Sequence, residues 1–176
     1  DKLTYHLAIQ AWSNMGSIQG AREAEKLLRK FCTEFLFKGA YAQPDVYAFT
    51  MVANAWAKST SSSAGPRMVS LFREMVELRE EGHVIGIEDP VFVHAVLQCF
   101  GNSNDPENAA AEAEEFWRNV GIRGTSVTSV SLISLYARAG NADAVRRLLN
   151  EISSDMVLNA QNYVTMLRAF CNRRLK

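Results

Sequence analysis

The chain has 176 residues, of which 48% are hydrophobic and 22% are charged, so it can bury a sizeable core as a single globular domain. It carries 19 Lys and Arg against 19 Asp and Glu, and this zero net charge excludes nucleic-acid binding through an overall basic charge, so any such surface must be local. No run of about 18 apolar residues occurs, and we therefore expect no insertion into a membrane.

The predicted elements are helices throughout, and they come in pairs. The first helix of each pair is predicted over residues 3–14, 45–58, from Asp89-Pro90 onward, 126–139 and 160–171. The partner helix is predicted over residues 20–36, 66–81, 106–120 and 142–153. No Asn-Gly turn and no sustained alternation of apolar and polar residues indicates a strand.

The helix ends carry clear signals. Gly140 is expected as a C-cap, and the polar, low-complexity stretch Ser59–Pro66 predicts a mobile surface loop. Good N-cap residues stand before four helices: Asp45, Asp89, Asp105 and Asn141.

One apolar pattern recurs in the first helices. In the copy opened by Pro44, the residues Phe49, Val52, Ala53 and Trp56 are spaced by three and four and share one helix face. Each copy has an aromatic anchor with apolar residues three and four positions before it, and we expect these anchors in the core. The anchors are Trp12, Trp56, Phe100, Tyr136 and Phe170.

The spacing of the anchors defines the fold class. Successive anchors are 44, 44, 36 and 34 residues apart, and the last two distances match a helix-turn-helix unit of roughly 34 residues. The pattern predicts an all-α protein, an α-solenoid of stacked antiparallel helix pairs with about four and a half repeats. We expect a single domain over 1–176 whose two ends cut a longer array. Its repeats are 1–44, 45–88, 89–124, 125–158 and a partial 159–176.

Several features are interpreted as structural. The widely spaced Cys32, Cys99 and Cys171 form no Cys-x-x-Cys motif and indicate packing thiols in a reducing compartment. Trp117 is expected in the core. Helix 106–120 carries Glu107, Glu112, Glu114 and Glu115, which predict a solvated acidic face.

No catalytic signature is found. The chain has no Gly-rich phosphate loop, no His-Glu-x-x-His and no Gly-x-Ser-x-Gly, and neither His6 nor His94 has a Cys or acidic residue at metal-ligand spacing. We therefore predict a protein that is not an enzyme, with no catalytic residues, no cofactor, no metal and no small-molecule substrate.

Four segments resemble the pentatricopeptide repeat (PPR) family. They are Pro44-Asp45-Val46, Ala57-Lys58, Leu71-Phe72-Arg73-Glu74-Met75 and Tyr136-Ala137-Arg138-Ala139-Gly140-Asn141. The order of Trp, Leu-Gly and Tyr that marks tetratricopeptide repeats is not found. The resemblance covers almost the whole chain and is strongest in the second and fourth repeats.

The resemblance implies binding of single-stranded RNA in mitochondria or chloroplasts, with one base read per repeat by two or three side chains. It places one reader in each first helix, at His6, Thr50, His94, Val130 and Val164. It places the second reader at the end of each repeat, at Asp45, Asp89, Thr125 and Asn159. Thr50 with Asp89 resembles the family's guanine pair, and Lys58 and Arg138 stand where the family often puts a cation against phosphate.

Two alternatives remain open. Val130 and Val164 cannot hydrogen-bond a base, and His6 and His94 are unusual readers, so the same fold could instead be a protein–protein scaffold in an organellar complex such as a ribosome. The weakest alternative is a regulatory helical-repeat part of an enzyme whose catalytic domain lies outside these residues.

Overall fold

The computed structural model describes residues 1–38, 43–80, 89–120 and 126–151, together with the single positions 160, 163, 164, 167 and 171. All regular structure in this described part is helical, which confirms the all-α prediction. The first helices are α1 (Lys2–Ser13), α3 (Val46–Lys58), α5 (Pro90–Cys99) and α7 (Ser126–Ala139). The partner helices are α2 (Ile18–Lys38), α4 (Ala64–Glu80), α6 (Pro106–Val120) and α8 (Ala142–Glu151), and a 3₁₀ turn η1 (Phe100–Asn102) follows α5.

The predicted N-caps form as expected. The Ala48 amide donates to Asp45 Oδ1 at 3.0 Å, and the Ala144 amide donates to Asn141 Oδ1 at 3.0 Å. The carboxylates of Asp89 and Asp105 accept amide hydrogen bonds in the same way. These bonds satisfy amides that have no partner within the helix, so a single side chain caps the start of each of these four helices.

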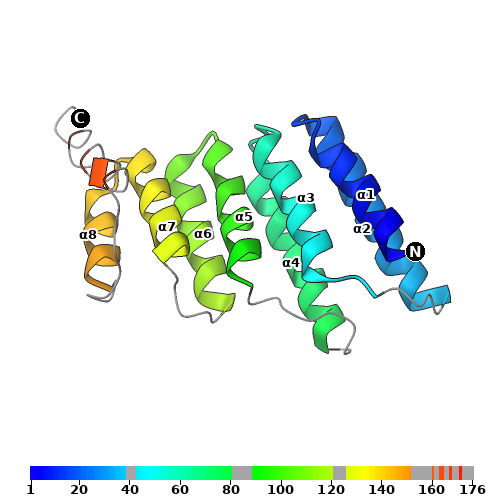
Figure 1. Ribbon diagram of the computed structural model, residues 1–176. Helices are drawn as coiled ribbons and strands as arrows, with labels where there is room; N and C mark the ends of the chain where they lie inside the picture. The colour runs from blue at the N-terminus through cyan, green and yellow to red at the C-terminus, as the bar shows by residue number, and fades with distance from the viewer. Residues whose placement is uncertain are drawn as a thin grey trace.

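The helices follow one another along the molecule, from α1 at one end to α8 at the other (Figure 1). Each first helix contacts the next one, in the order α1, α3, α5 and α7, and these contacts are more extensive than those between successive partner helices. The first helices therefore make one continuous surface.

The aromatic anchors pack as the sequence predicts, with one difference. Trp56, Phe100 and Tyr136 are buried, with exposed fractions of 0%, 2% and 6%. Trp12 is only partly buried against the core, because it belongs to the helix pair at the end of the row. Trp117 is also only partly buried, and Phe170 lies outside the described residues.

The predicted surface loop Ser59–Pro66 is wrong in part. Helix α4 already begins at Ala64, and both Ala64 and Gly65 are buried. Ser59 is also buried, and its backbone N–H and its hydroxyl both donate to the Trp56 carbonyl, at 3.1 Å and 2.7 Å, at the end of α3. The polar composition of this stretch reflects capping as well as solvent exposure.

One of the four glutamates of α6 is not solvated, which corrects the prediction for that face. Glu114 is 7% exposed. Its carboxylate accepts hydrogen bonds from the Tyr136 hydroxyl at 2.6 Å, from Arg118 at 2.6 Å and from Arg147 at 2.6 Å. These four residues, here called the Glu114 cluster, join α6, α7 and α8.

A second buried carboxylate, nearer the N-terminal end of the row of helices, is likewise surrounded by an aromatic donor and two arginines. Glu25 of α2 is 7% exposed and accepts from the Trp56 indole N–H at 2.9 Å. It also accepts from Arg29 at 3.1 Å and from Arg67 at 3.2 Å. The Arg67 guanidinium lies 4.9 Å from the centre of the Trp56 ring. This Glu25 cluster joins α2, α3 and α4.

None of the described helices is both long enough and apolar enough to cross a membrane.

Candidate nucleic-acid interface

Two of the expected base readers lie in direct contact. His6 Nε2 of α1 is 3.1 Å from Asp45 Oδ1, which caps α3, and Lys2 Nζ is 2.7 Å from Asp45 Oδ2. The Tyr47 ring meets the His6 ring edge-on, with 5.2 Å between centroids. His6 and Asp45 belong to the same predicted pair, and the structure brings them together.

The environment of Asp45 keeps its carboxylate charged. Partial burial by itself would raise the pKa of Asp45, but hydrogen bonds from Lys2 and the Ala48 amide, together with the charges of His6 and Lys2, outweigh burial. The pKa of Asp45 therefore lies below its usual value. Because both oxygens already have donors, a base would have to share or displace one of them.

Thr50 and Asp89, the predicted guanine pair, are each occupied by local backbone contacts. The Thr50 hydroxyl donates to the Val46 carbonyl at 2.8 Å, and the side chain is 8% exposed. Asp89 Oδ1 accepts the amides of Val91 and Phe92 at 2.7 Å and 3.1 Å. Such bonds within a helix and at its N-cap are common for Thr and Asp.

His94 is held in one orientation by the next first helix. Its Nδ1 is 2.8 Å from the Ser131 hydroxyl of α7, and burial lowers the pKa of His94. Among the described residues Nε2 makes no hydrogen bond. His94 is therefore a half-buried, neutral imidazole with one nitrogen left for a ligand.

The remaining expected readers are less informative. Val130 of α7 is half-buried, and its carbonyl accepts the Ser134 hydroxyl at 2.8 Å. Val164 is 39% exposed. Thr125 and Asn159 lie outside the described residues.

The two predicted phosphate contacts are both exposed. Lys58 ends α3, and Arg138 stands in the last turn of α7. Neither forms an ion pair with any described side chain. The Arg138 guanidinium lies close to Gly101 of η1: a Cβ added to this glycine would be 3.0 Å from it. Each of the two cations therefore stands at the C-terminal end of a first helix.

Sequence reasoning missed two further rows of side chains on the first helices. Nine residues before the anchors stand Leu3, Tyr47 and Val91, with exposed fractions of 64%, 51% and 63%. Two residues before the anchors Trp12, Trp56, Phe100 and Tyr136 the side chains are polar and uncharged. These are Gln10, Asn54, Gln98 and Ser134. Aligning the first helices on their anchors, rather than looking for single motifs, is the signal that finds both rows.

The first helices also lack acidic residues. Helices α1, α3, α5 and α7 contain no Asp or Glu, whereas they contain Lys2, Lys58 and Arg138. The acidic residues that contact this layer are the capping Asp1, Asp45 and Asp89, at the opposite ends of the helices from Lys58 and Arg138, and glutamates of the partner helices such as Glu25 and Glu114. The four first helices of this neutral chain therefore contribute no carboxylate of their own.

No three His, Cys, Asp or Glu side chains of the described residues gather as a metal site would require. What this surface offers is hydrogen bonding, apolar contact and local positive charge. Compared with known proteins, the chain matches no family model and no curated protein.

Proposed function

We propose that this chain is a PPR-like helical repeat, an α-solenoid of antiparallel helix pairs, that binds single-stranded RNA along its first helices. The observation that carries the proposal is that α1, α3, α5 and α7 contribute no carboxylate of their own, and that Lys58 and Arg138, at the ends of α3 and α7, form an ion pair with no described side chain. Phosphate groups are repelled by carboxylates and attracted by exposed Lys and Arg, so this layer favours a polyanion. Location in a mitochondrion or chloroplast is what the family resemblance implies.

The rows across the layer match the parts of an RNA strand. Exposed Tyr47 and Val91 offer apolar surface to unstacked bases. The polar row, which includes Asn54 and Gln98, offers both donors and acceptors to base edges. Lys58 and Arg138 then stand at the phosphate side of the strand.

Base preference is best supported at His94. Its Nδ1 is engaged by Ser131, so Nε2 is the nitrogen left to meet a base. At the other predicted positions, Asp45 and Thr50 already bond within the protein, and they contribute by sharing those bonds. The proposal therefore expects strong dependence on phosphate charge and moderate dependence on sequence.

The test is a salt-titrated binding assay of the chain with a short, randomised, single-stranded RNA. The variant Lys58→Glu/Arg138→Glu should weaken binding at least tenfold, and each lost contact should reduce the salt slope by about 0.7. The control Lys26→Glu/Arg146→Glu makes the same change in net charge on the partner helices α2 and α8, and should leave binding within about twofold.

Two results would contradict the proposal. Absence of binding at low salt would remove it, and equal losses in both double variants would reduce it to nonspecific attraction. His94→Ala tests base reading separately, because it should alter the preferred RNA sequence without changing the salt slope.

A protein scaffold is the second candidate function, and exposed apolar residues at the α1 end of the molecule favour it. Leu3, Leu7, Met15 and Ile18 are 64%, 58%, 55% and 42% exposed, so α1 and the start of α2 offer apolar surface to another protein. If the chain does not bind RNA but does form a complex with another protein, the scaffold function is supported instead.

A further inference from the structure

A groove lies between the partner helices α4 and α6, on residues that the proposed RNA surface does not use. It encloses about 450 Å³, which is within the usual range for binding pockets. Its apolar lining includes Val69, Phe72 and Phe116. The rings of Phe72 and Phe116 meet edge-on, with 4.9 Å between centroids, which gives the groove a rigid aromatic floor.

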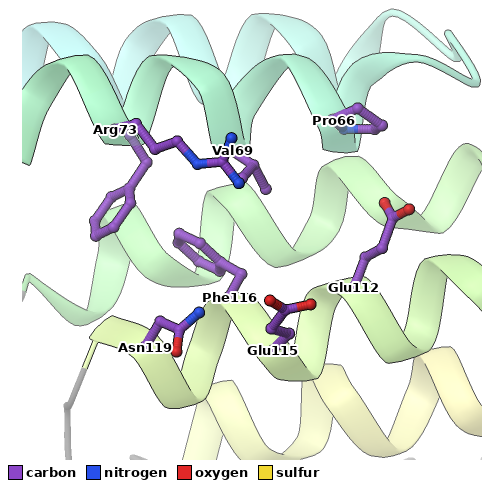
Figure 2. A pocket seen from close by; sticks show the side chains of 8 residues that line it. Pro66, Val69, Arg73, Glu112, Glu115, Phe116 and Asn119 are labelled. Atoms are coloured by element: carbon purple, nitrogen blue, oxygen red, sulfur yellow. The ribbon is translucent and has the colours of Figure 1, made fainter.

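The two sides of the groove carry opposite charges that do not meet. Figure 2 shows Arg73 on the α4 side and Glu112 and Glu115 on the α6 side. Arg73 and Glu115 form no hydrogen bond or ion pair with any described side chain, and Glu112 accepts only from Asn108, at 2.8 Å. Among the described side chains no ion pair joins α4 to α6, although ion pairs join α2 to α4 and α6 to α8.

The charge around the groove is predominantly negative on the α6 side. Helix α6 has four glutamates and one arginine, and the buried Glu114 is already neutralised by Arg118 and Arg147. Glu112 and Glu115 remain beside the groove. An RNA strand would be repelled there, whereas a basic segment would find both an aromatic floor and two carboxylates.

We propose that this groove binds a basic, apolar segment of a partner protein. One apolar side chain of that segment packs against Phe72 and Phe116, and neighbouring Lys or Arg side chains pair with Glu112 and Glu115. Arg73 on the opposite side fixes the direction of the segment by favouring an acidic residue or the segment's carboxyl end. Because the groove belongs to the partner helices, this contact and an RNA strand on the first helices can coexist.

The experiment uses the 176-residue chain and a pool of fluorescein-labelled nonapeptides that combine Leu, Phe, Lys and Arg at random. Fluorescence anisotropy should show salt-sensitive binding of this pool, at least tenfold tighter than a pool in which Glu and Asp replace Lys and Arg. The reverse preference, or no binding of the basic pool at low salt, would overturn the proposal.

Two variants locate the contact. Glu112→Lys/Glu115→Lys should weaken binding at least tenfold, whereas Glu23→Lys/Glu80→Lys makes the same charge change elsewhere and should leave it within about twofold. Val69→Trp fills the groove without changing charge and should also weaken binding at least tenfold, with helicity and melting temperature as checks on folding. Equal binding by all variants would overturn the groove as the site.

The same variants separate this proposal from RNA binding. Labelled RNA should bind Val69→Trp as it binds the unaltered chain, and excess RNA should not displace the basic peptides. Loss of RNA binding in Val69→Trp, or full displacement of the peptides by RNA, would assign the groove to nucleic acid and contradict a protein partner.

Discussion

The junction between α6, α7 and α8 differs from the junction between α4, α5 and α6 in one buried group. In the first, Glu114 receives hydrogen bonds from Tyr136, Arg118 and Arg147. In the second, the anchor is Phe100, which has no polar group to pair. The position in α4 that corresponds to Glu25 or Glu114, counted from the preceding anchor, is held by Val69 or Ser70.

The Glu25 cluster shows that this difference follows a rule within the chain. Trp56 and Tyr136 each donate to a glutamate of the preceding partner helix, and an arginine 11 residues after each aromatic completes the cluster. The polar ends of Trp56 and Tyr136 thus each face a buried carboxylate. At the junction whose anchor is Phe100, α4 places no buried carboxylate, and no ion pair of the described side chains crosses the groove between α4 and α6.

The difference shows that two kinds of contact hold neighbouring helices together. Apolar packing of the first helices is continuous along the molecule, whereas the partner helices are tied by buried carboxylates at two junctions and not at the third. A buried carboxylate tolerates no loss of its donors, so the tied junctions should be sensitive to single polar changes and the third should not.

The largest expected effect is at the Glu114 cluster. Glu114→Ala leaves the Tyr136 hydroxyl without its acceptor and leaves Arg118 and Arg147 with only their longer contacts to Glu151. Breaking a buried pair costs about 3–5 kcal/mol, and partial exposure of both arginines reduces the expected loss in unfolding free energy to roughly 2–4 kcal/mol. Urea unfolding measures it. Glu112→Ala, on the same helix but outside the cluster, should stay within about 0.5 kcal/mol, and equal losses would break the comparison.

The same cluster predicts a pH dependence. Hydrogen bonds from Arg147, opposed by burial and aided by Tyr136 and Arg118, lower the pKa of Glu114 from 4.5 to about 2. A carboxyl whose pKa is lowered by folding stabilises the protein above its unfolded pKa and loses that contribution as pH falls toward the folded one. The stability difference between the unaltered chain and Glu114→Gln should therefore shrink as pH falls from 4.5 to 2. A constant difference in acid unfolding would contradict this prediction.

The sequence predicted the helices and their starts well because those features are local. Asp45 and Asn141 bond to amides three residues away, so composition and position alone identify them as caps. The anchors could be predicted for a similar reason, since periodicity within one helix defines an apolar face. Trp12 shows the limit of that argument, because its burial depends on whether another helix pair covers it.

The buried glutamates could not be predicted because their donors come from other helices. Tyr136 and Arg147 lie 22 and 33 residues from Glu114 in the sequence. They reach Glu114 only because α7 and α8 pack beside α6 with these side chains facing it. Within the candidate site, His6 and Asp45 were expected in one pair, but their bond across 39 residues was not. The hydrogen bond of the Thr50 hydroxyl to the Val46 carbonyl of the same helix was also not predicted, because the family resemblance assigns Thr50 to a base and not to the backbone.

A smaller loss of stability is expected at the junction of α4, α5 and α6, which has no buried carboxylate and in which Gly65 packs against Phe100. A Cβ added to Gly65 would lie 2.5 Å from the Phe100 ring. Gly65→Ala should therefore lower the unfolding free energy by about 1–3 kcal/mol, although alanine normally favours a helix over glycine by about 1 kcal/mol. Thermal unfolding measures the change, and Phe100→Leu in the Gly65→Ala background should restore part of the loss by making room. An unchanged stability would mean that α4 and η1 are not in close contact.

The smallest expected change in stability is at Arg73, and it is compared directly with the change at Arg147. Arg73 and Arg147 are both exposed arginines of partner helices, but only Arg147 bonds to a buried carboxylate, with distances of 2.6 Å and 2.7 Å. Arg73→Ala should change the unfolding free energy by less than about 0.5 kcal/mol, since no described side chain pairs with it. Arg147→Ala should cost about 1–3 kcal/mol, because Glu114 loses a charged donor. Urea unfolding of the two variants decides between them, and a loss at Arg73 as large as that at Arg147 would mean that an ion pair ties α4 to α6 after all.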